Sequence, residues 1–163
     1  MGHKTRITIE TMRLHHLDAV RAIERQCFTT PWSYHAFHSE LTANDAAHYE
    51  VAKIDQTIVG YVGMWVVIDE GHITNLAVDP SYQRQGIGRR LMESVTAWAK
   101  RRGVIRMTLE VRASNHKAQL LYETMGYISV GFRLGYYIDN KEDAIIMWKE
   151  LSDHDKDRPS TGN

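Results

Sequence analysis

The stretch NLAVDPSYQRQGIGRRLM, residues 75–92, decides how the rest of the chain is interpreted. An apolar segment ends at Asp79-Pro80, and two glycines, Gly86 and Gly88, then precede a run with apolar residues at helical spacing. The first amide N–H groups of a helix have no partner within it, and the helix dipole favours negative charge beside them. Glycines let an anion approach such amides closely. With arginines on both sides, the stretch predicts a strand followed by an anion-binding helix N-terminus.

Composition limits the classes of protein that the chain can represent. Its 163 residues are 43% hydrophobic, which suits one globular domain. Lys plus Arg equals Asp plus Glu at 20 each, and this balance argues against a nucleic-acid partner. The single cysteine, Cys27, forms no internal disulfide, and no apolar run approaches the roughly 20 residues that span a bilayer. We therefore expect a cytoplasmic protein with no membrane partner.

Periodicity predicts an α/β (α+β) fold in which about four helices flank a central mixed, mostly antiparallel sheet of about seven strands. We expect turns at 55–56 and 69–71, a single domain over 1–150, and a polar, disordered tail over 151–163. The predicted strands are 6–10, 47–53, 57–67, 72–78, 106–111, 127–133 and 143–149. The predicted helices are 15–27, 33–42, one from 87 that ends near Gly103, and 115–125.

Three motifs together resemble one family. QRQGIG, residues 83–88, fits the pattern Q/R-x-x-G-x-G/A, which is weak by itself. LEVRASNHKAQLLYETMGY (109–127) and GYYIDNKEDAIIM (135–147) follow it in the same order and spacing as in the GCN5-related N-acetyltransferases. Over roughly residues 5–150 the sequence resembles the ribosomal-protein-alanine (RimI-like) branch and the archaeal N-terminal acetyltransferases.

The resemblance implies a site for acetyl-CoA. Backbone amides from Gln85 to Arg90 would hold its pyrophosphate, and arginine suits bidentate phosphate contact. The strand before the loop would bond the pantetheine arm like an added strand, with a bulge that frees the Val78 N–H to hold the thioester oxygen. Asn115 is a helix cap that would also contact the CoA arm. The implied cofactor-binding residues are Leu76, Ala77, Val78, Arg84, Gln85, Gly86, Ile87, Gly88, Arg89, Arg90 and Asn115.

The resemblance also assigns an acid and a base. Glu110 would be the general base, although a strand carboxylate at this position is otherwise a solvated surface residue. At pH 7, freeing an α-amine of pKa 7.7–8.0 costs about 1 kcal/mol and freeing a lysine amine costs about 4.6 kcal/mol, so a carboxylate favours N-termini. Tyr122 would be the general acid for the CoA thiolate. Transfer of the tyrosine proton to the thiolate runs uphill by about 2 kcal/mol. Tyr122 could therefore only donate a hydrogen bond to the sulfur, or it could be an ordinary buried tyrosine.

The expected substrate is a protein or peptide N-terminus. The segment FTTPWSY, residues 28–34, resembles a loop that walls the peptide slot in relatives, although Trp32 could instead dock in the core. A tyrosine pair in GYY matches one that holds the peptide backbone in relatives, and His72 is a secondary candidate as a polar relay. The implied substrate-binding residues are Phe28, Pro31, Trp32, Tyr34, His72, Tyr136 and Tyr137.

We therefore expect an enzyme that moves acetyl from acetyl-CoA to an N-terminal α-amine, with the N-terminal alanine of a ribosomal protein as one candidate. Direct attack in a ternary complex is expected, because Cys27 lies on an apolar helix stripe with no activating group beside it in sequence. The histidines lack a ligand pattern, so we expect no metal. A lysine or small-amine acetyltransferase and a non-catalytic acetyl-CoA sensor remain open. The sequence fixes neither the preferred N-termini nor the oligomeric state.

Overall fold

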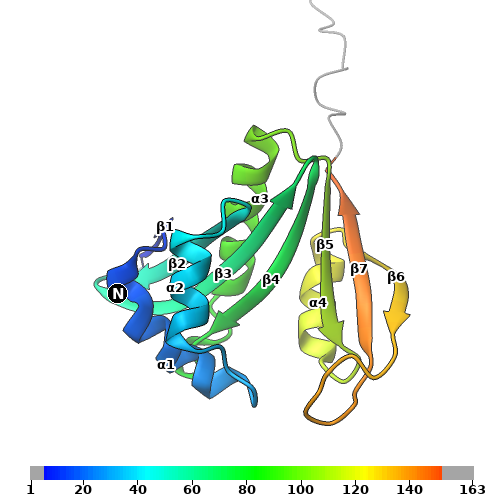
Figure 1. Ribbon diagram of the computed structural model, residues 1–163, viewed down its shortest axis with the longest axis horizontal. Coiled ribbons are helices and arrows are strands. Elements are labelled where there is room, and N and C mark those ends of the chain that lie inside the picture. Colours follow the sequence, from blue (N-terminus) through cyan, green and yellow to red (C-terminus); the bar gives the residue numbers. More distant parts are fainter. Residues whose placement is uncertain (1–5, 152–163) are drawn as a thin grey trace, which may run out of the picture.

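A computed structural model describes residues 6–151, which form one seven-stranded sheet in the order β1-β2-β3-β4-β5-β7-β6 (Figure 1). The strands are β1 (Ile7–Thr11), β2 (Ala47–Ile54), β3 (Thr57–Val67), β4 (Glu70–Val78), β5 (Arg106–Arg112), β6 (Ile128–Arg133) and β7 (Ala144–Glu150). The α-helices are α1 (Leu17–Cys27), α2 (Tyr34–Thr42), α3 (Ile87–Arg101) and α4 (His116–Thr124). Short 3-10 helices cover Leu14–His16 and Pro80–Tyr82. The predicted fold class is confirmed.

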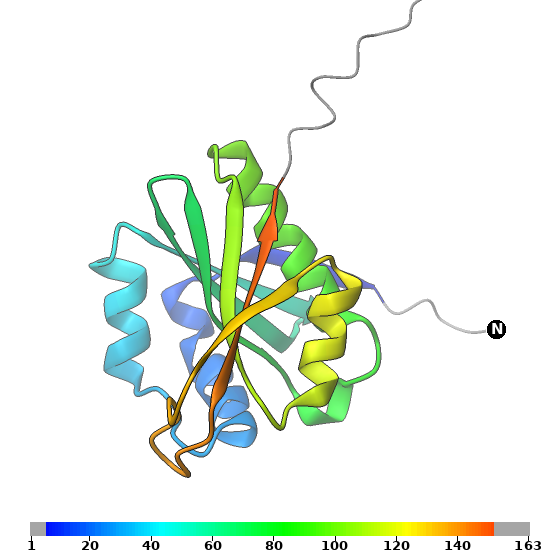
Figure 2. The ribbon, with the colours of Figure 1, turned by 90° about the vertical axis from the view of Figure 1, so that its right-hand side faces the viewer.

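The helices cover the sheet from both sides (Figure 2). Helices α1 and α2 pack over one face, where Leu17, Phe37 and Tyr61 are fully buried in one core cluster. Helix α3 packs over the other face, where Leu91 and Met107 belong to a second cluster. None of the helices within residues 6–151 has the length and apolar character needed to cross a membrane.

Two sequence predictions need correction at their edges. Strand β4 begins at Glu70, so the turn is Ile68–Asp69 and not 69–71. Gly71 belongs to the sheet because it pairs with Met107, where a Cβ would lie 2.6 Å from the methionine sulfur. Leu151, assigned to the tail, is buried, and its N–H donates to the Ile105 carbonyl at 2.7 Å. The remainder of the predicted tail lies outside the described residues.

Strands β4 and β5 are the central feature of the sheet because they pair only briefly. They are parallel and paired over three positions, Glu70–His72 against Arg106–Thr108. Beyond these positions they diverge, and Figure 1 shows the two halves of the sheet opening away from each other. Along β5, Leu109 is buried in the cluster that contains α3, so Glu110 faces the side of α1 and α2.

A bulge in β4 lies beside this opening. Asn75 pairs with Gly63 and Ile73 pairs with Met64, so Thr74 is the extra residue in the strand. The resemblance implied a bulge in this strand that frees the Val78 N–H; the bulge lies at Thr74, and Val78 itself pairs in register with Gly60. The physical reason is steric, because Gly63 leaves space that the Tyr49 ring and the Asn75 side chain fill.

Replacing Gly63 by alanine should destabilise the fold by about 2–3 kcal/mol, because overpacking a buried site costs this much. A Cβ there would lie 2.2 Å from Tyr49 Cε1 and 2.5 Å from Asn75 Oδ1. Thermal unfolding should show a Tm lower by roughly 5–10 °C. The matched control is Gly131→Ala, whose Cβ would have its nearest neighbour at 3.8 Å on Ile146. Equal Tm values for the two variants would contradict the assignment of Gly63 as a packing constraint.

Candidate active site

A cavity of about 670 Å³ lies where β4 and β5 separate. It is bounded by the loop after α1, by β4 and the start of α3, and by β5, α4 and the loop between β6 and β7. Most of the predicted site residues contribute to its lining. They are Phe28, Trp32, Leu76, Ala77, Val78, Arg84, Gly86, Ile87, Gly88, Arg89, Glu110, Asn115, Tyr122 and Tyr137.

The other predicted residues lie around the cavity. His72 and Tyr136 lie close to Glu110, whereas Pro31 lines a neighbouring hollow. Tyr34 lies outside the cavity lining, with the Arg21 guanidinium 5.7 Å from the centre of its ring. Neither Pro31 nor Tyr34 therefore contacts the cavity in which the sequence predicted them to bind substrate.

Gln85 and Arg90 also differ from the rest of the predicted anion loop. Both residues are exposed and lie outside the cavity lining. The Arg90 N–H donates to the Gly86 carbonyl at 3.1 Å, which closes the first turn of α3. Its amide is therefore committed to the first turn of the helix and is not among the free N–H groups there.

The start of α3 is built to leave amides free. Gly86 caps the helix with φ 75°, in the left-handed region, and Arg84 also has a positive φ of 66°. Since Arg90 is the first residue to bond back to Gly86, the amides of Ile87, Gly88 and Arg89 precede the hydrogen-bonded ladder. These three N–H groups and the helix dipole favour an anion.

Side chains add charge near these amides. Arg84 is exposed at the cavity rim, and Lys117, which the sequence analysis did not select, lines the cavity and donates to Gln83 Oε1 at 3.2 Å. Arg89 donates to Thr124 Oγ1 at 2.9 Å, so it also ties α3 to α4. The cationic side chains on the cavity lining therefore come from both sides of the helix N-terminus.

The free edge of β4 supplies further donors. The Asp79 N–H donates to the Val59 carbonyl at 2.8 Å, so by alternation Val78 and Gly60 form a non-hydrogen-bonded pair. The N–H and carbonyl of Val78 therefore point away from β3, toward the gap that β5 leaves. The Cys27 thiol reaches that carbonyl, with a sulfur-to-oxygen distance of 3.4 Å. Burial raises the pKa of this thiol, which leaves it a weak nucleophile.

Glu110 is held by two basic side chains, those of His72 and Arg133. His72 Nε2 lies 2.6 Å from Glu110 Oε2, and Arg133 Nε donates to Glu110 Oε1 at 3.2 Å. The hydrogen bond with His72 is the main reason that the pKa of Glu110 is lowered, and it outweighs the effect of burial. The carboxylate therefore stays ionised at neutral pH, facing the same side of the sheet as α1.

Tyr122, a residue of α4, lies in the core on the face of the sheet opposite Glu110. It is 8% exposed, and its ring centre lies 5.8 Å from that of Tyr127. Burial raises the pKa of Tyr122 above its ordinary value. A higher pKa makes full proton transfer from this hydroxyl to a thiolate more unfavourable.

Sequence reasoning missed Glu24. It is 2% exposed, lines the cavity, and accepts a hydrogen bond from the Trp32 N–H at 3.1 Å. Burial raises the pKa of Glu24 to about 7. Trp32 lines the cavity, and it also packs against Phe37 in the core with ring centres 5.3 Å apart. The two positions considered for Trp32, a slot wall and a core contact, are therefore compatible. An acidic residue on the apolar face of α1 was the signal that could have revealed Glu24.

Sequence reasoning also missed Arg133 and Arg112, which contact the site from β6 and β5. Their partners are distant in sequence, so no local pattern marks them. No group of three or more His, Cys, Asp or Glu side chains suited to a metal ion occurs within residues 6–151.

A splayed mixed sheet beside a glycine-capped helix is the arrangement that the sequence resemblance implied for an acyltransferase. The model of the acetyltransferase (GNAT) family matches residues 17–127, and the chain belongs to this family.

Two curated relatives show how closely the whole chain follows individual members. The [ribosomal protein bS18]-alanine N-acetyltransferase of Escherichia coli K12 is 40% identical over 149 residues, covering 89% of this chain and 98% of that protein. The N-alpha-acetyltransferase RimI of Mycobacterium tuberculosis is 38% identical over 137 residues, covering 80% of this chain and 84% of that protein.

Solved structures agree in fold. The crystal structure of the ribosomal-protein-S18-alanine N-acetyltransferase from Escherichia coli superposes with a TM-score of 0.83 at 37% identity, covering 90% of this chain and 95% of that one. Ard1 from Thermoplasma volcanium gives a TM-score of 0.82 at 21% identity, covering 90% and 98%. The second likeness supports the fold alone.

The ion-paired state of Glu110 should appear in the pH dependence of stability. Because its folded pKa is lowered, its contribution is complete above the unfolded value of about 4.3 and is lost as pH falls through the folded value. The free energy of unfolding of the wild type should exceed that of Glu110→Gln by about 1 kcal/mol at pH 7, and this difference should shrink below pH about 4.3. Urea unfolding of both proteins from pH 7 to pH 3 measures this. A constant difference over the whole range would contradict the assigned ion pair.

Proposed function

We propose that this protein transfers acetyl from acetyl-CoA to the N-terminal α-amine of proteins, with the N-terminal alanine of a ribosomal protein as the leading substrate. The observation that carries the proposal is one cavity that joins an unpaired strand edge and a glycine-capped helix N-terminus to a clamped carboxylate. Relatives at about 40% identity are named for acetylating the alanine of bS18, and this supports the choice of substrate. We assign the activity to the cytoplasm.

The residues present fit acetyl-CoA. The free amides of Ile87, Gly88 and Arg89 suit its pyrophosphate, and Arg84 adds charge at the rim. The open edge of β4 at Val78 suits the amides of the pantetheine arm, which would bond it as an added strand. When bound, acetyl-CoA supplies the thioester whose carbonyl carbon the substrate amine attacks.

Three groups of this chain would serve the reaction. Glu110 would take the proton from the α-amine, directly or through a water molecule. The Val78 N–H would donate to the thioester oxygen as negative charge develops there, an effect worth about 3 kcal/mol in other enzymes. Tyr122 would donate a hydrogen bond to the departing sulfur. No covalent enzyme intermediate is needed.

The lowered pKa of Glu110 bears on the choice of amine. A carboxylate with a low pKa is a weak base, so it suits an amine that is already close to neutral at physiological pH. An α-amine of pKa 7.7–8.0 meets this condition, and a lysine amine near 10.4 is much harder to deprotonate. The electrostatics of the site therefore support an N-terminal substrate.

The direct test is acetylation of a peptide library varied at its first two residues. We expect rapid transfer to free N-termini, with alanine among the preferred first residues, and little transfer to an N-terminally blocked peptide with an internal lysine. Glu110→Gln serves as the low-activity control. Faster modification of the lysine peptide would overturn the substrate class, and acetyl-CoA binding by calorimetry without thiol release from any peptide would support a sensor instead.

Replacing Tyr122 by phenylalanine should lower kcat by about tenfold to a hundredfold, because the departing sulfur loses one hydrogen-bond donor. The KM for acetyl-CoA should change much less, since the hydroxyl acts mainly as the thiolate forms. Initial rates at varied acetyl-CoA and saturating peptide measure both constants. Wild-type turnover in this variant would remove Tyr122 from the mechanism.

A further inference from the structure

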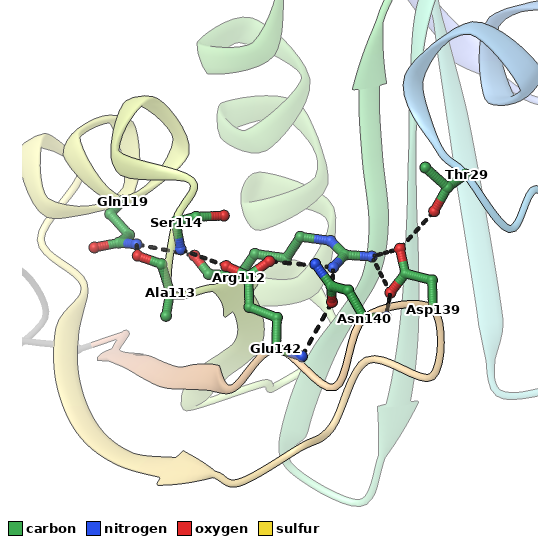
Figure 3. A network of polar contacts seen from close by, with 8 residues as sticks. All are labelled: Thr29, Arg112, Ala113, Ser114, Gln119, Asp139, Asn140 and Glu142. Atoms are coloured by element: carbon green, nitrogen blue, oxygen red, sulfur yellow. Dashed lines mark hydrogen bonds and ion pairs between the residues drawn. The ribbon is translucent and has the colours of Figure 1, made fainter.

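Arg112 holds the loop between β6 and β7 through contacts with Asp139, Asn140 and Glu142 (Figure 3). Tyr137, in the same loop, lines the cavity. Its guanidinium donates to both carboxylate oxygens of Asp139, at 3.0 and 2.9 Å. It also donates to Asn140 Oδ1 and Glu142 Oε1, each at 3.2 Å. The guanidinium carbon lies 4.0 Å from the centre of the Tyr137 ring. One side chain therefore fixes both the path of the loop and its inward tyrosine.

The contacts continue across the cleft to the other wall. Thr29 Oγ1 donates to Asp139 Oδ2 at 2.6 Å, although the two residues are 110 positions apart in sequence. Thr29 belongs to the loop between α1 and α2, whose Phe28 and Trp32 line the cavity. Figure 3 shows Asp139 between Arg112 and Thr29. The three side chains thus connect the two loops that face each other at the open end of the cleft.

The geometry makes this connection stronger than an ordinary surface ion pair. Arg112 and Asp139 are 26% and 20% exposed in their side chains, so water screens them only partly. Arg112 Nη2 donates to both oxygens of Asp139, and Nη1 donates to Asn140 and Glu142. Charge-assisted hydrogen bonds from two guanidinium nitrogens therefore fix the orientation of this side chain. Glu142, which also accepts from Arg112, accepts a second bond from the Ser114 N–H at 2.7 Å.

Arg112 also lies on the same strand and the same face as Glu110, the proposed base. It lies two residues after Glu110 on β5, so the two side chains share one face, and their Cα atoms are roughly 6.6 Å apart. The strand that positions the carboxylate therefore also positions the loop with Tyr137. Within residues 6–151, none of Arg112, Asp139 and Thr29 has a hydrogen bond to Glu110 or Tyr122.

We propose that Arg112, Asp139 and Thr29 form a strap that sets the separation of the two walls of the peptide slot, with Arg112 as a positioning residue for Tyr137. The proposal rests on the proposed function for the nature of its substrate. We expect the strap to act on how tightly the peptide is held and to leave acetyl-CoA binding unaffected, because within residues 6–151 its three side chains form no hydrogen bond with the first turn of α3.

The test compares Thr29→Val and Asp139→Asn with Thr42→Val. Thr42 Oγ1 also donates a hydrogen bond, to the His38 carbonyl at 2.7 Å on α2, so its variant controls for loss of a threonine hydroxyl. Thr29→Val and Asp139→Asn should each raise the KM for an alanine-initiated peptide by about threefold to tenfold. The KM for acetyl-CoA should stay within twofold of wild type, and Thr42→Val should leave both constants unchanged.

A second measurement does not depend on activity. The Tyr137 N–H donates to the Glu142 carbonyl at 3.1 Å, so its hydrogen exchange reports whether the loop is closed. Arg112→Lys keeps the charge, but its single nitrogen cannot bond Asp139 and Glu142 as the two guanidinium nitrogens do. This variant should speed exchange at Tyr137 by at least about tenfold, while exchange in the α3 core stays unchanged.

The outcomes separate the strap from the proposed function. Unchanged peptide KM in Thr29→Val and Asp139→Asn would overturn the strap, and so would unchanged exchange at Tyr137 in Arg112→Lys. Equal rises in both KM values, or a large fall in Tm with Thr29→Val, would show a merely structural role and would also overturn it. Wild type that acetylates no N-terminus would sink the proposed function instead, and the exchange experiment would still decide whether the strap exists.

Discussion

The whole site depends on the short pairing of β4 with β5. These two strands are held together over three positions, where Gly71 lets the Met107 side chain pack closely, and then they separate. A strand inside a sheet normally satisfies its backbone donors by pairing along both of its edges. Here the separation leaves the edge at Val78 unpaired and opens a cavity into which two sets of loops and α4 can contribute side chains. A continuous ladder would leave neither the donors nor the space.

Alternation along β5 then divides the chemistry between two faces. Leu109 faces the core under α3, and Glu110 faces the opposite side, where His72 and Arg133 hold it as a charged group. Tyr122 is buried on the α4 side, where burial keeps its hydroxyl protonated. The proposed base and the proposed hydrogen-bond donor thus lie on opposite faces of the sheet, and both line the one cavity at the gap between β4 and β5.

Much of this could be predicted from the sequence because it depends on local patterns. Apolar periodicity gave the strands and helices to within a few residues, and the glycines at 86 and 88 marked the start of α3. The bulge could not be located from the sequence, since it depends on how Tyr49 fills the space at Gly63. The contacts of Arg133 and Arg112 were missed for a related reason: periodicity assigns a residue to a face and does not identify the partner that reaches it from a distant segment.

The opposite orientation of Leu109 and Glu110 has a consequence for the order of events. If the acyl donor lies along β4 and α3 while the peptide lies under the α1 and β6–β7 loops, the two ligands reach the one cavity from opposite faces of the sheet. Neither ligand would then block the binding of the other, so we expect steady-state kinetics to show a random order of substrate binding. CoA could likewise leave from the α3 face of the sheet while the acetylated peptide leaves from the opposite face.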